Sequence, residues 1–240
     1  MGVVTDWIVL DTATGPMRMY IARPEGGTAG PGILVIQEIF GLTEDLQATC
    51  RRFAEEGFVA LAPEIYHAQP VRLGSYDDVA AAMKIREQMS DDQVLDDLNS
   101  AFRLLAARGE VRSGLVGALG FCAGGRDAFM LGTRNPDVMA VICFYGSLAP
   151  DDSDAPINDA AKLAGPSLIF YGEDDRVVPI AQADRVRDEL TRLGKDFEIV
   201  TYPNAGHGFM NAARARTYVA DVAAEAWTRT IDFLYEKLEG

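Results

Sequence analysis

The feature that most restricts the fold of this chain is a short glycine-rich turn near its middle. Residues 115–119 form an apolar run typical of a buried strand, and residues 126–131 have the apolar spacing of a helix. Between them, Gly120-Phe121-Cys122-Ala123-Gly124-Gly125 leaves no room for an ordinary loop. Glycines on both sides of a central residue tolerate a strained backbone and let the strand and helix pass closely. The pattern predicts a nucleophile elbow centred on Cys122.

A second interpretation of Cys122 is an ordinary core residue, because free cysteine is among the most buried residue types. The close glycines at a strand-to-helix junction favour the elbow.

Strand-like and helix-like segments alternate from about residue 33 to the end of the chain. The expected strands are 33–36, 58–63, 115–119, 140–146, 167–172 and 197–202, and the expected helices are 43–57, 76–89, 91–107, 126–131, 180–193 and 217–238. Before them, residues 7–10 and 17–22 predict an antiparallel hairpin, and residues 148–162 a long acidic loop. This alternation predicts an α/β fold with a mostly parallel central sheet and helices on both faces. Without an internal repeat or linker, residues 1–240 are expected to form a single domain.

The composition excludes several classes of function. A formal net charge of −14 argues against nucleic acid and anionic membranes as partners, and no apolar run approaches the roughly 20 residues of a membrane span. The three cysteines, Cys50, Cys122 and Cys143, are scattered without metal-binding spacing, and the first residues lack signal-peptide features. We therefore expect a cytoplasmic protein with no metal and no organic cofactor, acting as a monomer or small homo-oligomer.

Polar and reactive residues follow several of the predicted strands. In open parallel sheets, functional sites lie at the carboxyl ends of the strands. Residues 172–179 contain Asp174 and Asp175, and residues 204–209 contain His207. Nucleophile, acid and histidine then occur in the order of an α/β-hydrolase triad. A thiol needs an adjacent histidine as base, and that histidine needs a carboxylate to orient it. Cys122, Asp175 and His207 are the predicted catalytic residues.

Two choices accompany this assignment. Asp175 is favoured over Asp174, which is interpreted as a turn residue, because Asp175 begins the segment Asp-x-x-Val-Pro. The other histidine, His67, lies in an irregular segment and is expected to be a surface or pocket-rim residue.

Together these motifs resemble those of the dienelactone hydrolase (carboxymethylenebutenolidase) family, over about residues 7 to 238. The resemblance rests on Gln37-Glu38-Ile39-Phe40-Gly41, the elbow, residues 172–179 and Gly206-His207-Gly208-Phe209. It implies an α/β-hydrolase fold, a role for Glu38 in activating the thiol, and an oxyanion hole made by the amides of Ile39 and Ala123. The Ala123 donor also follows from its place at a helix N-terminus. A structural carboxylate bonded to a turn is the alternative for Glu38.

The chain departs from the family in the arginines that bind a substrate carboxylate. The best-known members carry a substrate-binding arginine four residues past the histidine, where this chain has Asn211. Arg214 and Arg216 could substitute, or could be solvated charges. Near the strand ends, Tyr66, Tyr145, Phe209 and Asn211 are the residues expected to line a pocket, with core packing the alternative for the aromatic ones.

The sequence therefore predicts a hydrolase that cleaves a small ester or lactone through a Cys-His-Asp triad and an acyl-enzyme intermediate. Two rival hypotheses are a binding protein that kept the fold without catalysis, and a redox protein that uses the Cys122 thiol. The redox hypothesis requires a resolving cysteine near Cys122.

Overall fold

The computed structural model describes residues 2–27 and 29–239. These residues group into two compact units, Met1–Gly117 and Ala118–Gly240. The boundary falls inside one strand, β5 (Val111–Phe121), which contributes residues to both units. The single domain expected from the sequence stays a prediction.

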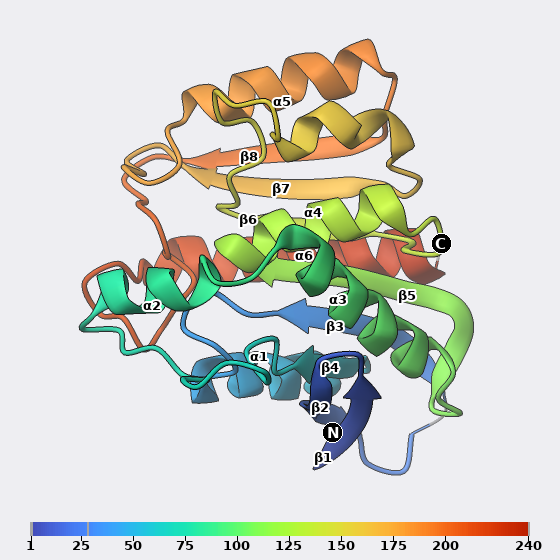
Figure 1. Ribbon diagram of the computed structural model, residues 1–240. Helices are drawn as coiled ribbons and strands as arrows, with labels where there is room; N and C mark the ends of the chain where they lie inside the picture. The colour runs from blue at the N-terminus through green and yellow to red at the C-terminus, as the bar shows by residue number, and fades with distance from the viewer. Residues whose placement is uncertain (1, 28, 240) are drawn as a thin grey trace. The chain divides into compact units, whose positions relative to one another are not determined.

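In the first unit the strands follow the order β1-β2-β4-β3 (Figure 1). Their bounds are β1 (Val3–Thr12), β2 (Gly15–Pro24), β3 (Gly30–Ile36) and β4 (Val59–Pro63). The hairpin β1–β2 and the pair β2–β4 are antiparallel, whereas β3 and β4 are parallel. The hairpin is longer than predicted, with pairing from Val3↔Pro24 to Thr12↔Gly15. Its outer residues pair through their backbone, which leaves no mark in the apolar pattern.

Three helices complete the first unit: α1 (Glu44–Glu55), α2 (Val79–Arg86) and α3 (Asp91–Ala106). Thr43 caps α1, its hydroxyl accepting a hydrogen bond from the amide of Leu46 at 3.4 Å. The apolar stripe of α1 is buried and packs against β2 and β4. Helix α2 is shorter than the predicted 76–89, and it begins where Asp78 accepts a hydrogen bond from the amide of Ala81.

In the second unit the strands follow the order β5-β6-β7-β8, and every neighbouring pair is parallel. The bounds are β6 (Val141–Phe144), β7 (Ser167–Gly172) and β8 (Phe197–Tyr202). Strands β7 and β8 have the predicted limits. Parallel pairing places the carboxyl ends of these strands at the same edge, which is where the candidate residues follow them.

The helices of the second unit are α4 (Ala123–Arg134), α5 (Ala181–Arg192) and α6 (Ala220–Glu239) (Figure 1). Helix α4 packs on β6, α5 on β8 and α6 on β7. The prediction of a loop over 148–162 is wrong in part, because Pro156–Lys162 forms a 3-10 helix, η1. A proline in the first turn and the bond from the Ile157 amide to the Leu148 carbonyl hold this turn in place.

Four aromatic rings form a ladder across the strands of the second unit. One comes from each strand: Phe121, Phe144, Phe170 and Tyr202. Successive ring centroids are 5.0, 4.5 and 6.1 Å apart, with interplanar angles of 20° or less. Such stacking ties the strands together just before the segments that carry the candidate residues. Within residues 2–27 and 29–239, no helix is long and apolar enough to cross a bilayer.

Candidate functional site

Cys122 stands at a sharp turn between β5 and α4. Its backbone has φ 55° and ψ −118°, a conformation that residues with side chains rarely adopt. The Cys122 amide donates to the Phe144 carbonyl at 3.0 Å, and the Cys122 carbonyl accepts from the amide of Gly125 at 3.0 Å. A Cβ atom at Gly120 would overlap the carbonyl of Gly124, so the close passage of strand and helix requires glycine there. The half-buried thiol thus sits at the start of α4, as the elbow pattern predicts.

The segments that carry the acid and the histidine are joined through their backbones. The Asp174 amide donates to the Ala205 carbonyl at 3.0 Å. A Cβ atom at Gly172 would overlap that same carbonyl, so only glycine allows this approach. The segment after β7 and the segment after β8 therefore meet at a defined position.

The contact between these segments brings Asp175 to His207. Asp175 Oδ2 lies 2.8 Å from His207 Nδ1. Asp175 Oδ1 accepts hydrogen bonds from the amides of Val177 and Val178 at 2.7 and 2.8 Å, which fixes the plane of the carboxylate. Asp174 is exposed and takes no part in this contact.

The surroundings of His207 change its proton affinity. Burial of the imidazole tends to lower the pKa of His207. The interactions with Asp175 and with the Cys122 side chain have the opposite effect and are stronger, so the pKa rises from 6.5 to about 10. Because Nδ1 contacts Asp175, Nε2 is the ring nitrogen that does not take part in this contact. Nε2 is buried and has no hydrogen-bond partner among the described residues.

Glu38 and Ile39 belong to the first unit, in the segment that follows β3. The Glu38 residue is buried, and the Ile39 carbonyl accepts a hydrogen bond from the Tyr66 hydroxyl at 3.0 Å. Gln37 Oε1 accepts from the amide of Ile65 at 3.3 Å, so this segment is held by the one that follows β4. The roles predicted for Glu38 and Ile39 toward Cys122 stay predictions.

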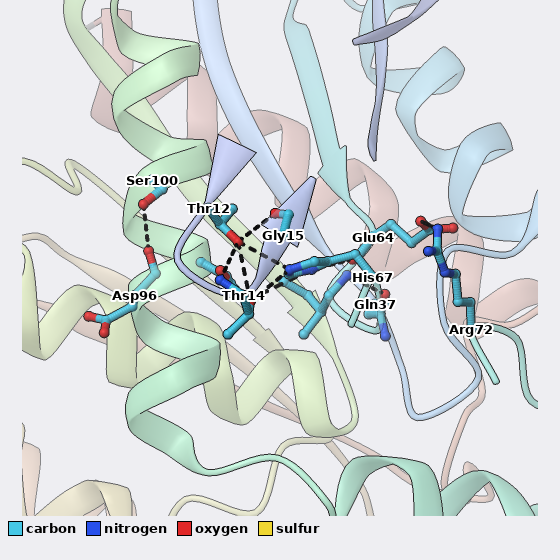
Figure 2. A network of polar contacts seen from close by, with 11 residues as sticks. Thr12, Thr14, Gly15, Gln37, Glu64, His67, Arg72, Asp96 and Ser100 are labelled. Atoms are coloured by element: carbon cyan, nitrogen blue, oxygen red, sulfur yellow. Dashed lines mark hydrogen bonds and ion pairs between the residues drawn. The ribbon is translucent and has the colours of Figure 1, made fainter. Parts of the chain in front are cut away.

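The expectation of a surface or pocket-rim position for His67 is wrong. The residue is 4% exposed, and its Nε2 lies 2.9 Å from the Thr14 hydroxyl and 3.2 Å from the Thr12 hydroxyl (Figure 2). Its Nδ1 lies 3.2 Å from the Glu64 carbonyl and 3.9 Å from Asp97 Oδ2. His67 therefore anchors the hairpin turn to the segment after β4. Local sequence does not mark this burial, because the side-chain partners of His67 are about 30 to 55 positions away.

The residues predicted to line a pocket are almost inaccessible to solvent. Tyr66, Tyr145 and Phe209 are 1%, 0% and 0% exposed, and Asn211 is 4% exposed. Their pocket role stays a prediction. Arg214 is half-buried, and its guanidinium lies against Gly208, the residue after His207.

The other two cysteines, Cys50 and Cys143, are buried and unpaired. Burial raises the pKa of both thiols, that of Cys143 to about 12. A protonated, inaccessible thiol reacts slowly, so neither is a reactive group in this conformation. In the described part of the chain, no three His, Cys, Asp or Glu side chains are grouped as a metal site requires.

Known proteins resemble this chain in both sequence and fold. The family model of the dienelactone hydrolase family matches residues 17–238. A Methylorubrum extorquens protein provisionally named carboxymethylenebutenolidase is 35% identical over 243 residues, which cover 97% of this chain and 81% of the relative. A similarly named Synechocystis protein is 34% identical, with 92% of each chain covered.

Solved structures extend the likeness to three dimensions. The crystal structure of a Klebsiella pneumoniae protein, provisionally named a dienelactone hydrolase, matches with a TM-score of 0.89 and 30% identity over 98% of this chain and 99% of that one. A dienelactone hydrolase-like promiscuous phosphotriesterase from metagenomic libraries matches with a TM-score of 0.85 and 25% identity over 98% of both chains.

These likenesses and the strand arrangement define an α/β-hydrolase fold, which confirms the predicted fold class. The chain belongs to the dienelactone hydrolase family. It is a hydrolase of the carboxymethylenebutenolidase type, as the sequence predicted.

Proposed function

We propose that this enzyme hydrolyses a small ester or lactone through Cys122, His207 and Asp175, with a thioester on Cys122 as the intermediate. The observation that carries the proposal is the 2.8 Å contact between Asp175 Oδ2 and His207 Nδ1, made beside a cysteine held at an elbow. In this arrangement each group has the neighbour that its role requires.

The surroundings of His207 suit it to accept the thiol proton of Cys122. The surroundings that raise the pKa of His207, among them the hydrogen bond to Asp175, favour transfer of the Cys122 thiol proton to Nε2. Asp175 stabilises the resulting imidazolium. This is the proton transfer of the sequence-based hypothesis, in which His207 takes the proton during attack.

The reaction then proceeds in two balanced steps. Cys122 Sγ attacks the carbonyl carbon as the thiol proton passes to His207 Nε2, the ester C–O bond breaks, and the leaving alkoxide takes that proton from Nε2. Water next attacks the thioester while Nε2 takes its proton, and the C–S bond breaks to release the carboxylic acid as Nε2 returns the proton to Sγ. For a lactone, the leaving alcohol remains attached to the acyl group.

The oxyanion formed in each step needs preorganised donors. Ala123 is the first residue of α4, and its amide has no acceptor within the helix. The family resemblance assigns the second donor to the amide of Ile39, in the segment after β3. The same resemblance gives Glu38 a part in activating the thiol. We further propose that the enzyme works in the cytoplasm as a monomer or small homo-oligomer.

The test uses p-nitrophenyl acetate and a simple lactone as substrates. The Cys122→Ala variant should lose turnover while its circular dichroism spectrum stays unchanged. Cys50→Ala is the matched control, because it also removes one thiol, and it should keep activity. Mass spectrometry of quenched wild-type enzyme should find the acetyl group on Cys122.

Other results would favour the rival functions. Undiminished turnover by Cys122→Ala would reject the proposed nucleophile. An unreactive Cys122 and no turnover by the wild type would point to a binding protein, and rapid peroxide consumption without hydrolysis would point to redox chemistry.

A further inference from the structure

Tyr145, which follows β6 directly, has an uncommon backbone conformation, with φ 41°. Among the residues that the structure describes, only Cys122 and Asn204 share a positive φ without being glycine. Cys122 follows β5 directly, and Asn204 follows two residues after β8. Backbone strain of this kind persists where the surroundings enforce it, and it gathers at functional sites. The position of Tyr145 therefore calls for a functional reason.

The backbone around Tyr145 is held from two sides. Its amide donates a hydrogen bond to the Phe170 carbonyl at 2.8 Å. At the next residue, Gly146, an added Cβ atom would lie 2.6 Å from Cys143 Sγ and 2.7 Å from the Arg126 amide nitrogen. Strand β7 and the first turn of α4 thus hold the strained residue in place.

The Tyr145 ring packs against the imidazole of His207. The ring centroids are 5.0 Å apart with an interplanar angle of 63°, and the Tyr145 residue is 0% exposed. On another side the Tyr145 ring meets Phe209 at 5.1 Å and 71°. The Tyr145 ring therefore packs along one side of the His207 imidazole.

This packing can restrain a motion of the imidazole that the hydrogen bond to Asp175 does not restrain. The hydrogen bond to Asp175 fixes the position of Nδ1, but the imidazole can still tilt and swing about that bond. A tilt would carry Nε2 away from Cys122. A packed aromatic ring restricts this motion, and its π-electrons also favour a neighbouring imidazolium.

We propose that Tyr145 is a positioning residue, whose ring holds His207 so that Nδ1 stays on Asp175 and Nε2 stays available to Cys122. The kinetic part of this inference rests on the proposed function. Among the described residues, His207 interacts with Asp175 from the segment after β7, Cys122 from the elbow and Tyr145 from the segment after β6. Arg214 lies beside the neighbouring Gly208.

The first experiment compares Tyr145→Leu with Tyr145→Phe. The leucine variant should lower kcat by about 10- to 100-fold with little change in KM, because misplaced catalytic groups lose rate rather than binding. The phenylalanine variant keeps the ring and should stay within about threefold of wild type. Tyr171→Leu is the matched control, since Tyr171 is also a fully buried tyrosine, next to the carboxyl end of β7. It should leave the pH profile of kcat unchanged.

The second experiment needs no turnover. NMR of labelled histidine should show that the Nδ1 proton signal of His207 broadens or shifts in Tyr145→Leu and persists in Tyr145→Phe. Iodoacetamide labelling of Cys122 at pH 6 should slow in parallel. If Tyr145→Leu does not fold, Tyr145→Met removes the ring with a smaller packing change.

The two experiments separate the inference from the function on which it rests. If the wild type proves inactive on esters, the NMR and labelling results still decide the role of Tyr145. Wild-type histidine signals and labelling rates in a folded Tyr145→Leu or Tyr145→Met protein would overturn the inference. An equal loss in Tyr171→Leu would also overturn it, by tracing the effect to general core packing.

Discussion

Asp175 Oδ2 lies 2.8 Å from Nδ1 of His207, and the Asp175 side chain is wholly inaccessible to solvent. The other oxygen of the same carboxylate accepts two backbone amides. The carboxylate is therefore preorganised for a single proton partner, and the exposed Asp174 beside it has no comparable contact.

This difference between adjacent aspartates leads to the first prediction. Asp175→Asn should lower kcat for ester hydrolysis by about 10³- to 10⁴-fold, because an amide cannot hold the imidazole in the required tautomer or stabilise its charge. Asp174→Asn should change kcat by less than about threefold, since that side chain is exposed. Steady-state kinetics on purified variants provides the measurement. The reverse order of effects would move the acid to Asp174.

The second prediction concerns the protonation of His207. The folded-state pKa is raised, so the proton stays bound below about pH 10 and is lost as the pH rises through that value. NMR titration of the imidazole carbons should show this transition well above the ordinary histidine range. In Cys122→Ala the transition should move to lower pH, because the Cys122 side chain is one of the groups that raise the pKa of His207. Titration of wild-type His207 near 6.5 would contradict the raised pKa that Asp175 and Cys122 are expected to give it.

The third prediction concerns the close approach at Gly172. Gly172→Ala should destabilise the protein by about 2 kcal/mol, because the new methyl group overlaps the Ala205 carbonyl and pushes the two segments apart. Activity should fall in the remaining folded protein, since Asp175 and His207 then separate. Gly109→Ala is the control: an added Cβ there has nothing within 4 Å. Urea unfolding and ester hydrolysis measure the two effects, and equal stability of both variants would contradict the steric argument.

The fourth prediction concerns the buried His67 cluster. His67→Phe should lower the free energy of unfolding by about 1 to 3 kcal/mol, because it removes the partner of two threonine hydroxyls and leaves Asp97 more isolated. Burial already raises the pKa of Asp97, against the opposing effect of His67 and Thr12. Urea unfolding at pH 7 provides the measurement. Thr5→Ala is the control, at an exposed position of β1, the strand that ends at Thr12. It should change stability by less than about 0.5 kcal/mol.

Much of the fold was open to sequence-based reasoning because it depends on local patterns. The limits of β7 and β8, the Thr43 cap and the strand-to-helix turn at Cys122 follow from apolar runs, capping residues and glycines within a few positions. The order of Cys122, Asp175 and His207 along the chain pointed to one reaction class before any distance was known. Each of these features depends on residues that are close together in the chain or on their order, so the sequence alone can indicate it.

The rest was decided by contacts between distant segments. That His67 is buried, that Tyr145 packs on His207 and that Gly172 admits the Ala205 carbonyl depend on partners from about 30 to 60 positions away. The seven-residue helix η1 likewise depends on its bond to Leu148 as well as on its own composition. Burial and ring contacts depend on tertiary packing. The same tyrosine or histidine can be buried in the core, packed against a functional residue or exposed, depending on which segments pack against it. The sequence by itself determined the family and predicted the reacting groups, and only the tertiary structure decided which neighbours hold those residues.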